Sequence, residues 1–118
     1  MDIQLKRIYE PAEPGDGFRV LVDRVWPRGV AKEEARLDAW PKELAPSKEL
    51  RKWFGHEPDR WDAFKDSYFR ELRQQEDRLG EILEMASKAR VTLVYASKEE
   101  RYNNAVALKI FLESEAGQ

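Results

Sequence analysis

The chain has 118 residues, the length of one domain with one core, so we expect a single domain over residues 1–118. Charged residues make up 37% of it, but 21 Lys and Arg nearly balance 23 Asp and Glu, and the net charge of −2 gives no overall attraction for nucleic acid or acidic lipid. The absence of cysteine excludes disulfides, thiolate nucleophiles and Cys-based zinc or iron–sulfur sites.

The N-terminal segment predicts a strand. Residues 1–6 lack the apolar core of a secretory signal, and no run approaches the length that spans a bilayer, so we expect a soluble cytoplasmic protein with no membrane partner. Ile3 and Leu5 alternate with polar residues, which predicts a first strand to about Tyr9. The loop at 10–17 is too short for a crossover helix. The first two strands are therefore either antiparallel neighbours or joined by an extended loop around the sheet edge.

A second buried strand is predicted from Val20 to Trp26, because the segment is largely β-branched and apolar, and Pro27 stops it. Asp23 and Arg24 are unusual within it, since an ionised group inside a sheet costs several kcal/mol unless it is paired. Two interpretations stay open. Each of the two side chains forms a structural ion pair with another element, or both face a wet pocket.

The middle of the chain predicts helices, because apolar residues recur there at helical spacing between Ser, Pro and Gly boundaries. The predicted segments are 31–37, 48–54 with Ser47 as N-cap and Gly55 at the end, a helix from Pro58 through Leu72, and a stretch around 79–86 that continues the third or starts another. The face formed by Trp61, Phe64 and Tyr68 is expected to be core. Gly80 is expected at the joint between the last two segments.

The C-terminal part predicts one strand and one helix. Residues 91–96 form an apolar, β-branched run typical of a central strand in a parallel sheet. The last helix is expected to begin at about Asn103 or Asn104, and the tail at 114–118 is expected to fray. The resulting order, β-β-α-α-α-β-α, predicts an α/β fold: a small three-layer α/β/α sandwich with a short, mainly parallel sheet.

A candidate site follows from this topology, because open α/β sheets bind ligands beyond the carboxyl ends of their parallel strands. If the second and last strands are parallel neighbours, the segments after them converge and offer guanidinium, aromatic and amide groups for a phosphate, a carboxylate or a nucleotide-like ligand. The candidate ligand-binding residues are Arg24, Trp26, Arg28, Tyr95, Asn103 and Asn104. As alternatives, Trp26 is a core residue and Asn103 or Asn104 only caps the last helix.

A secondary basic rim is predicted at Lys48, Arg51 and His56. Lys48 and Arg51 lie three residues apart on one helix face, although such residues are more often a solvated surface. His56 is the only histidine and suits a general acid or base, a cap or an exposed loop. No metal-binding pattern and no dinucleotide, NTP or zinc-protease motif is present, so we expect no metal and no cofactor, and no catalytic residue can be assigned.

Three functions compete. The first is an anion- or nucleotide-binding pocket at the strand ends, with or without enzymatic activity. The second is a nucleic-acid-binding or regulatory protein, which the acidic balance disfavours. Nucleic-acid binding would use exposed tryptophans for stacking and these basic side chains as phosphate contacts: Arg19, Arg28, Lys32, Lys48, Arg51 and Lys52. The third is a non-enzymatic partner-binding protein with an exposed tryptophan patch. Substrate, oligomeric state and physiological partner do not follow from the sequence.

Five blocks, spanning nearly the whole chain in order, carry a resemblance to a known family. They are residues 6–9, 16–29, 45–52, 92–96 and 103–106. They resemble the YeaO-like family of small bacterial proteins, a domain of unknown function (DUF488). The resemblance implies a layered α/β fold with the second block at a strand end, and it brings no established activity. Many members resemble an Asn-His-Ala order where this chain has Asn103-Asn104-Ala105, which favours binding or capping by the pair over histidine-dependent proton transfer.

Overall fold

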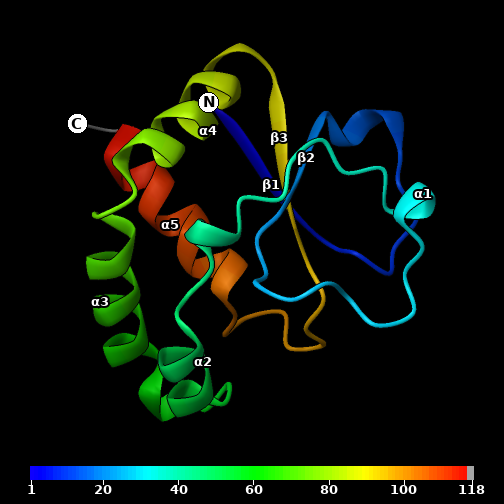
Figure 1. Ribbon diagram of the computed structural model, residues 1–118. Coiled ribbons are helices and arrows are strands. Elements are labelled where there is room, and N and C mark those ends of the chain that lie inside the picture. Colours follow the sequence, from blue (N-terminus) through cyan, green and yellow to red (C-terminus); the bar gives the residue numbers. More distant parts are fainter. Residues whose placement is uncertain (117–118) are drawn as a thin grey trace.

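Two strands, four helices, a third strand and a last helix follow one another in the computed structural model, which describes residues 1–116 (Figure 1). They are β1 (Asp2–Arg7), β2 (Phe18–Leu21), α1 (Lys32–Ala35), α2 (Lys48–Phe54), α3 (Trp61–Leu72), α4 (Glu76–Lys88), β3 (Arg90–Tyr95) and α5 (Asn104–Ala116). Short 3-10 turns lie at Pro14–Asp16, Lys42–Leu44 and Pro58–Arg60. The expected fraying concerned residues 114–118. Residues 114–116 continue α5, and 117–118 lie outside the described residues.

The sheet is parallel, with the order β1-β3-β2, so the last strand along the chain is the central one. Both outer strands pair with it in register, Ile3 opposite Val91 on one side and Phe18 opposite Val91 on the other. β1 and β2 are therefore not neighbours, and of the two predicted arrangements the extended connection is correct. This connection lies against β3, where the Thr92 hydroxyl donates to the Asp16 carbonyl at 2.6 Å.

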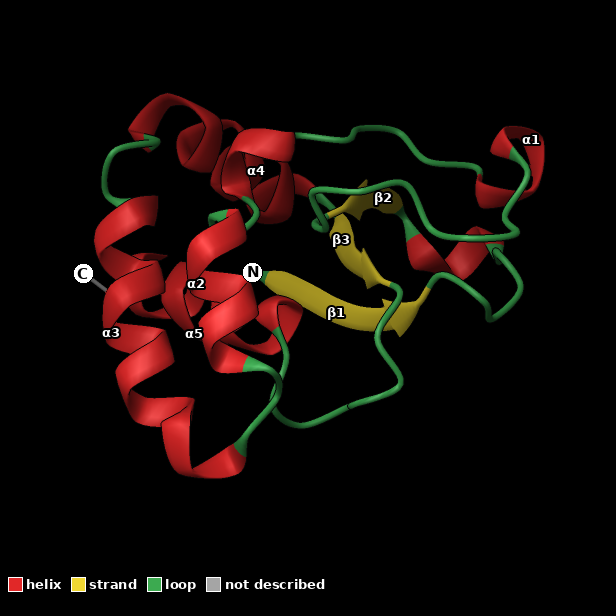
Figure 2. Cartoon of the chain, turned by 60° about the horizontal axis from the view of Figure 1, so that its bottom comes forward, coloured by secondary structure: helices red, strands yellow, loops and turns green. Residues whose placement is uncertain are grey.

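The two faces of the sheet are covered differently, as Figure 2 shows. On one face α3, α4 and α5 bury a large apolar core that includes Ile3, Val20, Val91, Leu93, Phe64, Tyr68, Leu108 and Leu112. On the other face, irregular chain and the short α1 cover a smaller cluster around Ile8, Ala35 and Val94. The predicted α/β class with a short parallel sheet is confirmed. The second outer layer is mostly loop.

Buried charge fills part of this second face. Arg19 is 3% exposed and donates to Asp16 Oδ2 at 2.6 Å and to the Ala35 carbonyl at 2.8 Å. Lys6 Nζ lies 3.0 Å from Asp16 Oδ1 and 2.7 Å from Glu13 Oε1. The prediction of Arg19 as a phosphate contact is therefore wrong, because all three bonds of its guanidinium point into the protein.

The second strand is shorter than the sequence predicts. β2 ends at Leu21, and Val22 makes a last backbone bond to the Val94 carbonyl at 3.0 Å before the chain leaves the sheet. Val25, expected in a buried strand, is 60% exposed. The apolar side chain of Val25 suggests a buried strand, but β3 ends at Tyr95, so the chain at Val25 has no strand to pair with.

Two helix boundaries also differ from the predictions. The first helix spans only Lys32–Ala35, because Arg36 adopts a left-handed φ of 47° that ends it. The joint between the long helices lies at residues 73–75, and Gly80 sits inside α4. A glycine within a helix costs only about 1 kcal/mol relative to alanine, so it does not have to mark a boundary.

The predicted caps of α2 are confirmed. The Ser47 hydroxyl accepts from the Leu50 amide at 3.2 Å, and Gly55 ends the helix with φ of 54°. This local geometry fixes where the helix begins and therefore how it presents Arg51.

We expect Ser47→Ala to lower the free energy of unfolding by about 1 kcal/mol, the usual effect of removing a helix N-cap. Urea denaturation monitored by circular dichroism measures it. Ser87→Ala is the control, because Ser87 is exposed on α4 and its hydroxyl donates only to the Glu84 carbonyl one turn earlier. Equal effects of the two substitutions would contradict the capping role.

Candidate functional site

A cavity lies at the edge of the sheet where all three strands end, and we call it the strand-end pocket. Because both outer strands run parallel to β3, the segments that follow β1, β2 and β3 meet at this edge. The volume of the cavity is about 370 Å³. It is lined by Tyr9, Asp23, Arg24, Val25, Trp26, Pro27, Arg28, Pro46, Arg51, His56, Ala96, Ser97 and Asn104.

The pocket brings together most of the predicted site residues. Arg24, Trp26, Arg28 and Asn104 of the candidate ligand site line it, and so do Arg51 and His56 of the basic rim. Residues from three separate parts of the sequence thus share one cavity.

Tyr95, Asn103 and Lys48 do not line the pocket. Tyr95 is 4% exposed and packs in the core under the helices. Asn103 is fully buried, where its Nδ2 donates to the Glu99 carbonyl at 2.7 Å and its Oδ1 accepts from the Val106 amide at 2.9 Å. Asn103 therefore has the capping role that was the alternative, and these three residues are not part of the proposed site.

Asp23 ties the strand ends together. Its Oδ2 accepts from the Ala96 amide at 2.9 Å and its Oδ1 from Asn104 Nδ2 at 3.0 Å, and the same Asn104 nitrogen donates to the Val22 carbonyl at 2.9 Å. Burial raises the pKa of the Asp23 carboxyl, although these hydrogen bonds and the charges of Arg51 and His56 oppose the shift. The end of β2 is thereby attached to the end of β3 and the start of α5.

Arg24 is held by backbone carbonyls instead of a carboxylate. Its Nη2 donates to the Ala45 carbonyl at 3.0 Å and its Nε to the Pro46 carbonyl at 3.3 Å. The structural ion pairs considered for Asp23 and Arg24 do not form, since no oppositely charged group lies within 4.0 Å of either among residues 1–116. Both side chains line the pocket and also brace its walls.

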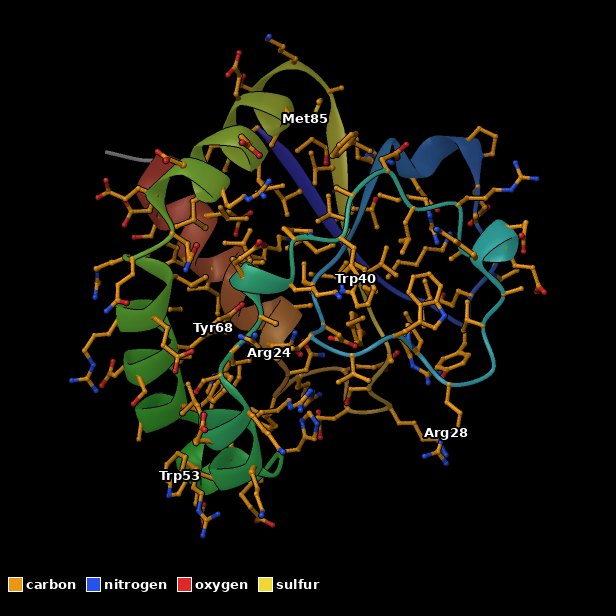
Figure 3. The ribbon with its side chains drawn as sticks, in the orientation of Figure 1. Arg24, Arg28, Trp40, Trp53, Tyr68 and Met85 are labelled. Carbon is orange, nitrogen blue, oxygen red and sulfur yellow. The ribbon has the colours of Figure 1, made fainter. Side chains whose placement is uncertain are left out.

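Arg28 and Arg51 are cations without a charge partner. Both are exposed, and within the described part of the chain neither guanidinium has a carboxylate within 4.0 Å. Figure 3 shows Arg28 extending outward from its loop at the edge of the molecule. With three arginines and one aspartate, the charges lining the pocket sum to +2 when His56 is neutral. The lining of the pocket thus has a positive net charge although the whole chain is acidic.

A second cavity shows the contrast. It measures about 310 Å³ and lies between the Trp40 loop and α4 near Met85 (Figure 3). Its one cation, Arg78, is 3.8 Å from Glu43 and 3.5 Å from Glu81. The cation of this cavity is therefore already paired with carboxylates, unlike Arg28 and Arg51 in the strand-end pocket.

His56 has a defined orientation. Its Nδ1 lies 2.9 Å from the Tyr102 carbonyl, which can only accept, so Nδ1 carries the proton. In the neutral ring, Nε2 is then an acceptor, 3.5 Å from the Ser97 hydroxyl. His56 also has a left-handed φ of 57°, directly after Gly55. This backbone conformation is uncommon for a residue other than glycine, and it brings the ring to the pocket wall.

The apolar part of the wall includes Tyr9, which the sequence reasoning missed. Tyr9 is 47% exposed, and its hydroxyl donates to the Arg28 carbonyl at 2.8 Å. Tyr9 follows β1, and the sequence left the direction of β1 open. Only a β1 that runs parallel to β3 places Tyr9 at the strand-end pocket. Trp26 donates from Nε1 to the Val30 carbonyl at 2.8 Å and meets Trp40 edge-on at 5.4 Å. Trp26 is therefore both a pocket wall and part of the packing beneath it.

Among residues 1–116, no three His, Asp or Glu side chains come together in a group that could hold a metal ion. In the same residues, none of the helices combines the length and the apolar surface needed to cross a bilayer.

Known proteins resemble this chain along almost its whole length. A family model described as the inactive DUF488-N3 subclade matches residues 2–118. The uncharacterized protein YeaO of Escherichia coli (strain K12) is 45% identical over 114 residues, which cover 97% of this chain and 99% of that protein. The uncharacterized protein Rv3073c of Mycobacterium tuberculosis (strain ATCC 25618 / H37Rv) is 41% identical over 106 residues, 90% of this chain and 89% of that protein. No solved structure matches the chain.

Proposed function

Because this chain belongs to the YeaO-like DUF488 family, in the subclade described as inactive, we propose that its strand-end pocket binds a small anionic ligand without transforming it. The ligand class is a phosphate, a carboxylate or a nucleotide-like molecule. Arg51 and Arg28 supply the charge that attracts it, and Tyr9 and Trp26 supply apolar wall.

One observation carries this proposal: Arg28 and Arg51 line a cavity without any carboxylate within 4.0 Å among residues 1–116. A guanidinium presents a rigid fork of N–H donors that matches the oxygens of a phosphate or carboxylate. Two N–H groups of Arg24 already donate to the Ala45 and Pro46 carbonyls, so Arg51 and Arg28 are the guanidiniums that remain available to bind an anion.

Binding without turnover is supported by the residues beside Asp23. The family pattern of an Asn-His-Ala order would place a histidine at position 104, in contact with the Asp23 carboxylate. This chain has Asn104 there, and its amide donates to Asp23 Oδ1. An amide does not transfer protons near neutral pH, so Asn104 cannot supply the proton transfer that a histidine at this position would allow.

Arg51→Ala is expected to weaken binding by at least about tenfold, because a hydrogen bond to a charged group contributes about 1.5–3 kcal/mol. Isothermal titration calorimetry with inorganic phosphate, glucose 6-phosphate and AMP, at low salt, measures it. Lys52→Ala is the matched control, since Lys52 is the next residue on α2, is also exposed and does not line the pocket.

The outcomes are distinct. Loss of affinity in Arg51→Ala with unchanged affinity in Lys52→Ala supports the site. An equal loss in both variants would indicate unspecific attraction by surface charge, and no binding of any of these probes or of organic acids to the unmodified chain would refute the proposal.

A further inference from the structure

The carboxylate of Asp23 is the one feature of the strand-end pocket that simple anion binding does not explain. It lies half-buried in a cavity whose other charged groups are arginines, and it would repel an incoming phosphate or carboxylate. Its two oxygens accept from the Ala96 amide and from Asn104 and so brace the strand ends, but the negative charge of the carboxylate is unfavourable for an anion.

Asp23 also retains free capacity for hydrogen bonds. An ionised carboxylate has about four acceptor positions, and this one accepts two bonds from the described residues. No cation lies within 4.0 Å of it among residues 1–116. Asp23 is therefore a partly desolvated negative charge whose hydrogen-bond donors from the protein are all neutral. A cationic donor on a ligand would neutralise this charge and occupy a free acceptor position of the carboxylate.

The cations of the pocket are separated into a fixed and a free group. Arg24 is held by the Ala45 and Pro46 carbonyls, whereas Arg51 has no protein partner on its guanidinium within the described residues. The pocket thus presents a fixed negative group, Asp23, and an available positive group, Arg51, to the same cavity of about 370 Å³. A ligand with both charges matches this arrangement better than a plain anion.

We infer that the ligand is a small zwitterion, in which an ammonium or similar cationic nitrogen donates to Asp23 while a phosphate or carboxylate group binds Arg51. This inference rests on the proposed anion binding and names the class of ligand for the same pocket. It predicts that a cationic nitrogen on the ligand strengthens binding, which an exclusively anion-selective pocket would not show.

Three probes of similar size test it by calorimetry at low salt: phosphoethanolamine, which carries both charges, ethyl phosphate, which carries only the anion, and ethanolamine, which carries only the amine. We expect phosphoethanolamine to bind at least about tenfold more tightly than ethyl phosphate. In Asp23→Asn this advantage should disappear, so that phosphoethanolamine and ethyl phosphate bind equally tightly, whatever the change in the affinity for ethyl phosphate itself. Asp66→Asn, an exposed change on α3 outside the pocket, is the control and should keep the advantage.

The results separate the two proposals. If ethyl phosphate binds as tightly as phosphoethanolamine, the zwitterion inference is overturned and anion binding stands. If neither phosphate probe binds, and inorganic phosphate, AMP and organic acids do not bind either, anion binding itself fails. Should Asp23→Asn not fold, the comparison of the three probes on the unmodified chain decides the question.

Discussion

Asp16→Ala is expected to lower the free energy of unfolding by about 3–5 kcal/mol, because it leaves two buried cations without their shared partner. The side chains of Arg19 and Lys6 are 4% and 11% exposed, and both lie within 3.0 Å of the Asp16 carboxylate. The Asp16 carbonyl also accepts from Thr92 of the central strand, so the cluster is anchored to the sheet. Equilibrium urea denaturation measures the effect.

Glu13→Ala is the control for the same cluster. Glu13 lies 2.7 Å from Lys6, but its side chain is 68% exposed, so we expect a cost below about 1 kcal/mol. A comparable cost for both substitutions would mean that burial does not set the strength of these pairs.

The stabilisation of the fold by the Asp16 carboxylate should be lost at low pH. Burial opposes ionisation of Asp16, but bonds from the Glu13 amide, Lys6 and Arg19 outweigh it and hold the pKa below the ordinary value of 3.8. A lowered folded-state pKa stabilises the fold above pH 3.8, and this contribution is lost as the pH falls through the folded-state value. The difference between the unmodified chain and Asp16→Ala should therefore be constant near neutrality and shrink below pH 3.8.

Gly17→Ala is the second substitution with a large expected effect, at least about 3 kcal/mol. Gly17 has φ of 68° and ψ of −135°, a region that side chains strongly disfavour. An added Cβ would also overlap the backbone carbonyl of Arg90, because the chain passes directly against the start of β3 before β2 begins. Thermal or urea unfolding of the variant measures the combined cost of strain and overlap.

Gly15→Ala is the control for Gly17→Ala, because Gly15 lies in the same loop without the positive φ and the close approach to Arg90 that constrain Gly17. An added Cβ at Gly15 meets nothing within 4 Å, and Gly15 does not have a positive φ. We expect a change within about 1 kcal/mol. A mild effect of Gly17→Ala, similar to that of Gly15→Ala, would show that the connection can move away from β3.

Features with a local cause were predictable from the sequence. The Ser47 cap and the Gly55 end of α2 depend on neighbouring residues only, and both are confirmed. The apolar run of β3 predicted a central strand in a parallel sheet because burial on both faces requires such a run. The convergence of Arg24 and Arg28 with Asn104 then followed from the rule that parallel strands end at one edge.

Features that depend on distant partners were not predictable. The burial of Arg19 requires Asp16 and the Ala35 carbonyl, which a pattern of residue types does not bring together. The position of Tyr9 at the pocket depends on the direction of β1, which its sequence does not contain. Asn103 and Asn104 are identical residues, and only their placement at the start of α5 makes one a cap and the other a pocket residue.

The place of β3 in the sheet has a consequence for how the chain folds. Among the described residues β1 pairs with β3 alone, whereas β2 pairs with β3 and also exchanges backbone hydrogen bonds with Asp38 and Ala39. Every contact of these two strands with the central strand joins residues that are far apart in the sequence, which predicts slow folding for so short a chain. During synthesis β1 therefore has no sheet partner until β3 has left the ribosome, whereas β2 can already bond to Asp38 and Ala39. The pocket is then completed in the same step that forms the sheet.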